Sequence, residues 1–183
     1  VALFACDSTM AWGRGLFRSN LRRIMSPDAD LFLFDDDVVM ARRMAVSFRL
    51  HSRCAMEQRQ GEVWVMGQRS ALRVVPLNWT PAEVTITVEG VDSHLQPVNM
   101  LRLVVAPSRQ HRLLTAIQVV RLASNETRLW HFEHNPRGLV CSRGAWQVRL
   151  AQGQRPALRA EVWRDRARLV SATCATTQWK VSA

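Results

Sequence analysis

The sequence contains no tyrosine and only one lysine, Lys180, so its 25 basic residues are 25 − 1 = 24 arginines and that lysine. Against 15 acidic residues they give a formal net charge of +10. Arginine makes bidentate contacts with phosphate and carboxylate groups, which fits an anionic partner. The arginines are nevertheless spread from Arg14 to Arg168. A codon bias toward arginine and a solvated basic surface explain that spread better than nucleic-acid binding does.

Long apolar runs are absent as well. No stretch reaches the roughly 18 residues that a membrane span requires, so we expect a soluble protein without one. The chain begins at Val1, and its first residues lack the basic, apolar and small-residue order of a signal peptide. With 48% hydrophobic residues among 183, the chain is long and apolar enough to form a packed core.

The four cysteines are Cys6, Cys54, Cys141 and Cys174, and none forms a C-x-x-C pair. This spacing does not support a zinc ribbon or a thioredoxin-like redox motif. Buried free thiols are the default expectation, and an oxidising compartment would allow two disulfides in three connectivities.

Recognised catalytic and cofactor motifs are also missing. The sequence has no phosphate-binding glycine loop, no nucleophile elbow and no dinucleotide fingerprint. In "WHFEHN", His131 and Glu133 share one face of a strand while His134 points away, so the segment does not assemble three metal ligands. We therefore assign no catalytic residue, metal or cofactor from the motifs.

From residue 44 onward the hydrophobic pattern has a period of two. Segments such as "GEVWVMGQ" and "AEVTITVEG" are strand-length, rich in Val and Trp, and separated by turn residues at intervals of about 8 to 12 residues. This rhythm predicts a mainly β protein built as an antiparallel sandwich or pair of sandwiches. We expect a β-sandwich domain over 44–115, and further strands over 116–183 in the same or a second small domain.

Residues 1–43 favour a helical segment in front of these strands. Ser26 followed by Pro27 is typical of a helix N-terminus, where proline loses no hydrogen bond. Asp35, Asp36 and Asp37 would then end the helix. Three consecutive side chains diverge, so the pattern does not indicate a catalytic pair or a metal site; Asp35 and Asp37 would be the first candidates for one.

The order of a Ser-Pro segment and a β-sandwich resembles the C-terminal part of the α-galactosidase clan, glycoside hydrolase family 27 and its relatives. In that family a Val-Trp strand opens the sandwich, and an asparagine-centred turn follows. The matching residues here are Leu16, Phe17, Ser19, Asn20, Leu21, Arg22, Ser26, Pro27, Asp37, Val38, Glu62, Val63, Trp64 and Asn78. The resemblance covers roughly residues 1–115.

The resemblance implies a non-catalytic β-sandwich portion of a carbohydrate-active enzyme, which packs on a missing barrel and buttresses a sugar site. The family's nucleophile and acid/base aspartates lie on barrel strands that this chain does not contain. Tryptophan rings are the usual stacking surfaces for sugars. Trp64 and Trp79 are therefore the predicted carbohydrate-binding residues.

Two alternatives stay open. The strand rhythm around "LNWTPAEV" also resembles PilZ-type cyclic-di-GMP barrels, although Asn78, Thr80 and Glu83 stand where that family has Asp, Ser and Gly. A competing function is an arginine-rich structural or nucleic-acid-binding subunit of a large assembly such as a ribosome or virion, with strongly salt-dependent binding. Its candidate phosphate-binding residues are Arg22, Arg23, Arg42 and Arg43.

Overall fold

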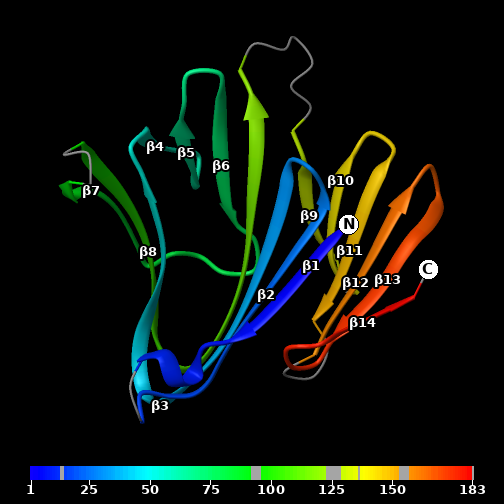
Figure 1. The fold of residues 1–183 in the computed structure, drawn as a ribbon, viewed down its shortest axis with the longest axis horizontal. Coiled ribbons are helices and arrows are strands. Elements are labelled where there is room, and N and C mark those ends of the chain that lie inside the picture. The colour runs from blue at the N-terminus through cyan, green and yellow to red at the C-terminus, as the bar shows by residue number, and fades with distance from the viewer. Residues whose placement is uncertain (13–14, 92–95, 123–128, 136, 153–156, 183) are drawn as a thin grey trace.

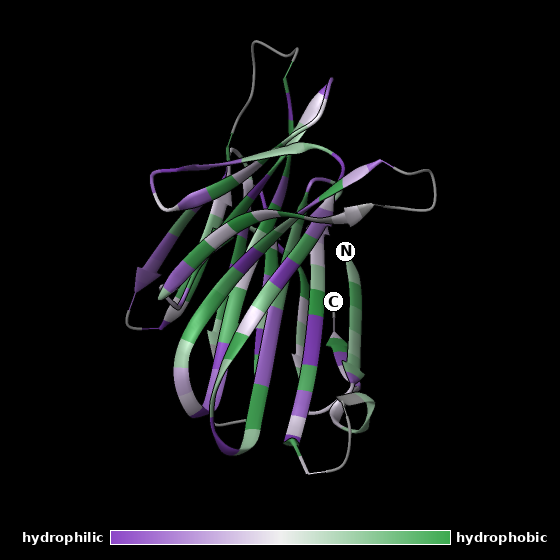
Figure 2. Cartoon of the chain, turned by 90° about the vertical axis from the view of Figure 1, so that its left-hand side faces the viewer, coloured by the Kyte–Doolittle hydropathy of each residue, from purple (hydrophilic) through white to green (hydrophobic). Residues whose placement is uncertain are grey.

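The computed structural model describes residues 1–12, 15–91, 96–122, 129–135, 137–152 and 157–182, which form 14 strands and one short 3-10 helix, η1 (Thr9–Trp12). The strands form two sheets, and every pairing within them is antiparallel (Figure 1). Hydrophilic (purple) and hydrophobic (green) residues alternate along many of the strands in Figure 2, as expected when one face of a sheet packs on a core and the other faces solvent. The expected mainly β, antiparallel class is confirmed.

The larger sheet has the order β1-β2-β3-β8-β6-β5-β4, with β7 paired to β8. Its two longest strands, β3 and β8, pair with each other at the centre of the sheet. The bounds are β1 Ala2–Asp7, β2 Phe17–Asp28, β3 Leu31–Ser52, β4 Ala55–Arg59, β5 Glu62–Met66, β6 Ser70–Pro76, β7 Glu83–Val91 and β8 Pro97–Arg121.

The smaller sheet is a simple meander with the order β14-β13-β12-β11-β10-β9. Its bounds are β9 His131–Asn135, β10 Gly138–Arg143, β11 Trp146–Gln152, β12 Leu158–Arg164, β13 Ala167–Cys174 and β14 Trp179–Ser182. The indole Nε1 of Trp179 donates to the carbonyl of Phe4 at 3.1 Å, which ties β14 to β1 at the margins of the two sheets.

The larger sheet folds back on itself. Phe34 and Phe48 lie 14 residues apart on β3, a span of roughly 45 Å in a straight strand. Their ring centroids are nevertheless 6.3 Å apart, in an edge-to-face arrangement. The fold occurs where the register between β3 and β8 shifts, between Val39 and Met44. We call the part beyond this point, residues 46–52, β7 and residues 97–105, the outer arm.

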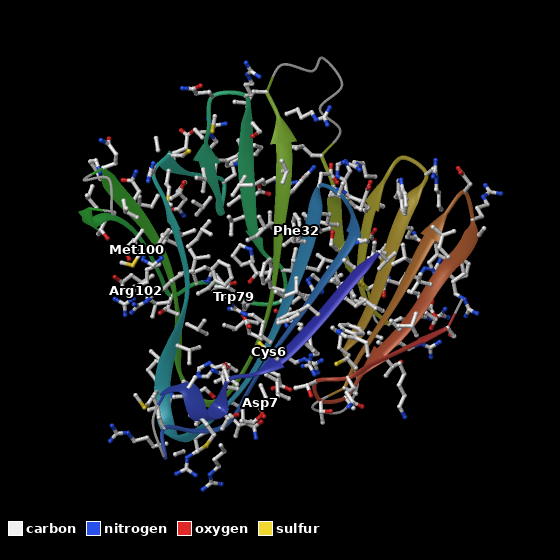
Figure 3. All side chains as sticks on the ribbon, viewed as in Figure 1. Cys6, Asp7, Phe32, Trp79, Met100 and Arg102 are labelled. Atoms are coloured by element: carbon white, nitrogen blue, oxygen red, sulfur yellow. The ribbon has the colours of Figure 1, made fainter. Side chains whose placement is uncertain are left out.

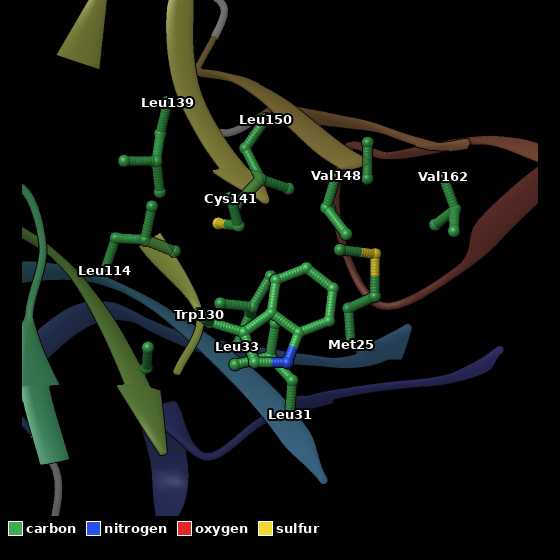
Figure 4. Close-up of a cluster of buried hydrophobic side chains, with 12 residues drawn as sticks. Met25, Leu31, Leu33, Leu114, Trp130, Leu139, Cys141, Val148, Leu150 and Val162 are labelled. Carbon is green, nitrogen blue, oxygen red and sulfur yellow. The ribbon is translucent and has the colours of Figure 1, made fainter. Parts of the chain in front are cut away.

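The fold-back creates two apolar cores, one on each side of the central part of the larger sheet. The inter-sheet core is centred on fully buried Trp130 and is closed by the smaller sheet (Figure 4). The second core lies under the outer arm, where Phe48, Leu101 and Leu103 meet Val74 and the faces of neighbouring strands. Because β3 is buried on both faces, its start "LFLF" is continuously apolar instead of alternating.

The expected helix over residues 1–43 is wrong. Residues 17–28 and 31–52 are strands, and the only helical turn among the described residues of this region is η1. Pro27 lies where the register shifts between Met25 and Asp28, so its missing N–H breaks no ladder hydrogen bond. The Ser26 hydroxyl donates to the carbonyl of Asp28 and helps to shape a hairpin turn, not a helix start.

The expected domain limits at 43/44 and 115/116 fall inside β3 and β8. Both strands are continuous through these points and contribute to both cores. Among the described residues, no helix has the length and apolar character to cross a membrane.

Candidate functional site

The acidic run Asp35–Asp37 lies in the first half of β3, where Asp35 and Asp36 stand opposite arginines of β2 across the β2–β3 hairpin. Arg23 stands opposite Asp35, and its Nη2 lies 2.7 Å from Asp35 Oδ2 and 3.7 Å from Asp37 Oδ2. Arg112 of β8 approaches the other oxygen of Asp35 at 3.2 Å. The side chains of Arg23 and Asp35 are 0% and 1% exposed, so the network is inside the protein.

The same network links the two sheets. Arg112 Nη2 donates at 2.8 Å to the carbonyl of Ala157, the residue immediately before β12. Cys174 at the end of β13 is fully buried, and burial raises the pKa of its thiol. All four cysteines are free. The charges of Arg23 and Arg112 balance those of Asp35 and Asp37 between the sheets. Such a buried ion-pair network helps to hold the strands in register.

Asp36 points to the opposite side of the sheet. Arg22 donates from Nε and Nη2 to its two oxygens at 2.6 and 2.9 Å, and the same guanidinium lies over the rings of Phe34 and Phe48. Burial raises the pKa of Asp36, while the hydrogen bonds from Arg22 act in the lowering direction. The hydrogen bond to Asp36 also raises the pKa of Arg22.

This geometry determines what the acidic run does. Asp35 and Asp37 share one face, Asp36 lies on the other, and each contacts an arginine. The described part of the chain contains no group of three His, Cys, Asp or Glu side chains able to hold a metal ion. The run is an internal ion-pair arrangement, and its position in a strand, not at a helix end, is the correction to the expectation above.

Trp64 lies on a polar face of β5. Across the neighbouring strands it stands opposite Glu57 of β4 and Arg73 of β6, which share its face. Arg59, which pairs with Glu57, places its guanidinium carbon 5.4 Å from the Trp64 ring centroid. Glu62 pairs with Arg73 at 2.5 Å. We call these five residues the Trp64 face; its indole is partly exposed.

One end of the Trp64 face is fixed to the smaller sheet. Arg73 Nη1 donates to the carbonyl of Trp130 at 2.9 Å, and its guanidinium lies over the ring of Phe132 on β9. Sequence reasoning predicted a binding role for Trp64 but did not predict which charged residues surround it. The spacing Glu62-x-Trp64 indicates one shared face, whereas the contributions of β4 and β6 depend on strand register.

Trp79 is not part of that face. Leu77 donates its N–H to Leu114 and packs in the inter-sheet core, whereas Trp79 packs against the core under the outer arm (Figure 3). Its indole Nε1 is buried and has no hydrogen-bond partner among the described residues. The two predicted sugar-binding tryptophans therefore lie on opposite sides of the larger sheet.

The four predicted phosphate-binding arginines separate in the same way. Arg22 and Arg23 are held by the aspartates of β3. Arg42 and Arg43 are exposed where β3 folds back, and Arg43 Nε donates to the carbonyl of Pro107 at 2.9 Å. Arg109 is exposed on the facing part of β8, so the fold-back presents three arginines to solvent.

No family model matches the chain, and no curated protein matches it at a significant level. The functional argument therefore depends on the geometry of these faces.

Proposed function

We propose that the chain is the non-catalytic β-sandwich portion of a carbohydrate-active, α-galactosidase-like glycoside hydrolase, and that the Trp64 face contributes to its sugar site. The observation that supports this function is the partly exposed indole of Trp64, flanked in one plane by carboxylates and guanidinium groups. A pyranose presents C–H groups on its ring face and hydroxyls on its edge. An aromatic ring bordered by hydrogen-bonding groups matches both.

The use of arginine supports the same choice over the assembly function. Arg22, Arg23, Arg73, Arg112 and Arg143 each form an ion pair with an aspartate or glutamate of the fold. Nucleic-acid binding needs basic groups that face the phosphates. These five of the 24 arginines instead contribute to strand pairing and to contacts between the sheets.

The test is retention of the 183-residue chain by galactomannan, a polysaccharide with α-galactosyl branches, in affinity electrophoresis. Trp64→Ala is expected to weaken binding about tenfold, because it removes the stacking surface. Trp163→Ala is the matched control, since Trp163 is also a half-buried strand tryptophan with an arginine, Arg149, over its ring at 4.9 Å. No retention, or equal loss in both variants, overturns the proposal.

One observation favours the second candidate, a nucleic-acid-binding subunit. Arg42, Arg43 and Arg109 are exposed together at the fold-back. If this is the functional surface, the chain binds a DNA duplex at low salt and releases it as salt rises. The nucleic-acid-binding function is favoured if the Arg42→Ala/Arg43→Ala variant loses DNA binding and the wild-type chain is not retained by galactomannan.

A further inference from the structure

A separate cavity of about 450 Å³ opens at the lower end of the inter-sheet space, beyond the buried ion-pair network. Its volume lies within the roughly 300–1,000 Å³ that small-molecule sites occupy. In Figure 3 the labelled Asp7 marks this end of the molecule, near η1 and the turn that joins β13 to β14. The Trp64 face is on β4–β6, so the cavity and that face share no residue.

Three adjacent strands supply one wall of the cavity. Asp7 stands opposite Leu21, Leu21 opposite Asp37, and Ser19 opposite Val39. Directly opposed residues of antiparallel strands share a face, so all five side chains belong to the same side of β1–β3. The wall combines two apolar side chains with a hydroxyl and two carboxylates.

The other wall is the β13–β14 turn, which contributes Thr176 and Thr177. The cavity therefore brings three hydroxyl groups together with two carboxylates. Asp37 has a side chain only 3% exposed and lies 3.7 Å from the guanidinium of Arg23, so its position is fixed by the ion-pair network behind it. Hydrogen bonds from Thr9 lower the pKa of Asp7, which keeps that carboxylate ionised at neutral pH.

This lining selects among ligand classes. A bare cation would use the carboxylates but leave most of a 450 Å³ space filled with water, and the described residues offer no third acidic, His or Cys ligand there. A purely apolar ligand would bury Asp37 and Ser19 against groups that cannot pair with them. A small polyhydroxylated molecule matches both parts, with C–H groups against Leu21 and Val39 and hydroxyls donating to the carboxylates.

We propose that this cavity is a binding site for a single neutral sugar residue, held by Asp7, Asp37 and the hydroxyls of Ser19, Thr176 and Thr177. The site goes beyond the proposed function and does not depend on it, because it uses none of the Trp64 face.

The experiment is calorimetric titration of the 183-residue chain with free D-galactose, D-glucose and D-mannose, and separately with calcium chloride. We expect at least one hexose to bind and calcium alone not to. Thr176→Val/Thr177→Val should weaken hexose binding about tenfold, because two hydrogen-bonding hydroxyls become methyl groups of similar size. Thr173→Val is the matched control, since Thr173 is exposed on the adjoining β13 and does not line the cavity.

Each outcome decides the proposal. Absence of binding by all three hexoses, binding of calcium alone, or equal affinity in the double variant and the control overturns it. Asp37→Asn gives a second test, because it replaces a carboxylate that accepts hydrogen bonds from the hexose. Hexose binding should weaken in this variant, and its unfolding transition is recorded to show that it is folded. The Thr176→Val/Thr177→Val variant reports on the cavity, whereas Trp64→Ala reports on the Trp64 face in the galactomannan test, so failure of one proposal is distinguishable from failure of the other.

Discussion

Asp35 is the side chain on which the buried network depends, because it receives both Arg23 and Arg112. Asp35→Ala removes the carboxylate that both arginines contact and leaves Arg23 with the more distant Asp37 at 3.7 Å, so we expect the free energy of unfolding to fall by about 3–5 kcal/mol. Glu57→Ala breaks an ion pair of the same type at the surface and should cost less than about 1 kcal/mol. Urea denaturation measures both, and similar small losses would show that the network contributes little.

Asp36 gives a pH dependence of defined sign. Burial raises its pKa above the ordinary value of 3.8, so the native state holds the proton more tightly than the unfolded state. Its contribution to stability is therefore present at low pH and declines as pH rises from about 3.8 through the native pKa, after which it is constant.

The check is the difference in unfolding free energy between the wild type and Asp36→Asn, measured from about pH 3 to pH 7. Asparagine does not titrate, so this difference isolates Asp36 from the other carboxylates. We expect the difference to become less favourable to the wild type as pH rises. A difference that grows with pH would mean that the hydrogen bonds from Arg22 outweigh burial.

At the scale of elements, the β9–β10 hairpin depends on a backbone position that only glycine fits. Gly138 has φ of +132°, and a Cβ there would lie 2.1 Å from the carbonyl oxygen of Leu150 on β11. Gly61, in the β4–β5 hairpin, also has a positive φ, +83°, but faces open space. We expect Gly138→Ala to lower the free energy of unfolding by about 3 kcal/mol or more, and Gly61→Ala by about 1 kcal/mol.

Thermal or urea unfolding measures the loss of stability in each glycine variant. Both variants introduce backbone strain, but only Gly138→Ala also introduces a clash with β11. Equal losses would show that the hairpin moves away from β11 at no cost.

The elements also show how far the sequence predicts the fold. Alternation identified most of the strands after residue 44, because most of them bury one face only, but it missed the short strands β4, β10 and β14. It failed on β3, which packs on both faces and so hides the period of two. It failed on β2 because Ser26 followed by Pro27 was interpreted as a helix start, although the burial of β2 alternates. A mirror relation was nevertheless present: Arg23 and Asp35, like Arg22 and Asp36, are equidistant from a centre at residue 29. That symmetry indicates a hairpin with cross-strand ion pairs.

The candidate sites divide along similar lines. Trp64 could be found from its strand, but its neighbours Glu57 and Arg73 come from other strands whose register the local sequence does not determine. The cavity was beyond sequence reasoning, because Thr176 and Asp37 are 139 residues apart (176 − 37) and meet only through sheet packing.

At the scale of the whole molecule, Trp130 joins the two sheets. It is 0% exposed, its Nε1 donates to Asp30 at 3.3 Å, and Arg143 covers its ring at 4.9 Å. Trp130→Ala should lower the free energy of unfolding by about 3–5 kcal/mol, because the indole leaves a cavity between the sheets. In the wild type we expect one transition by far-UV circular dichroism and by tryptophan fluorescence. Two separate transitions would show that the sheets unfold independently.

The long central pair also has a consequence for synthesis of the chain. Leu31 of β3 pairs with Gln118 of β8, 87 residues later (118 − 31), and the cover of the inter-sheet core continues to β12 and β13. A ribosome adding about 5–20 residues per second leaves the apolar side of β2 and β3 bare for on the order of ten seconds. The β2–β3 hairpin is thus a potential substrate for a holdase chaperone until β13 has left the exit tunnel.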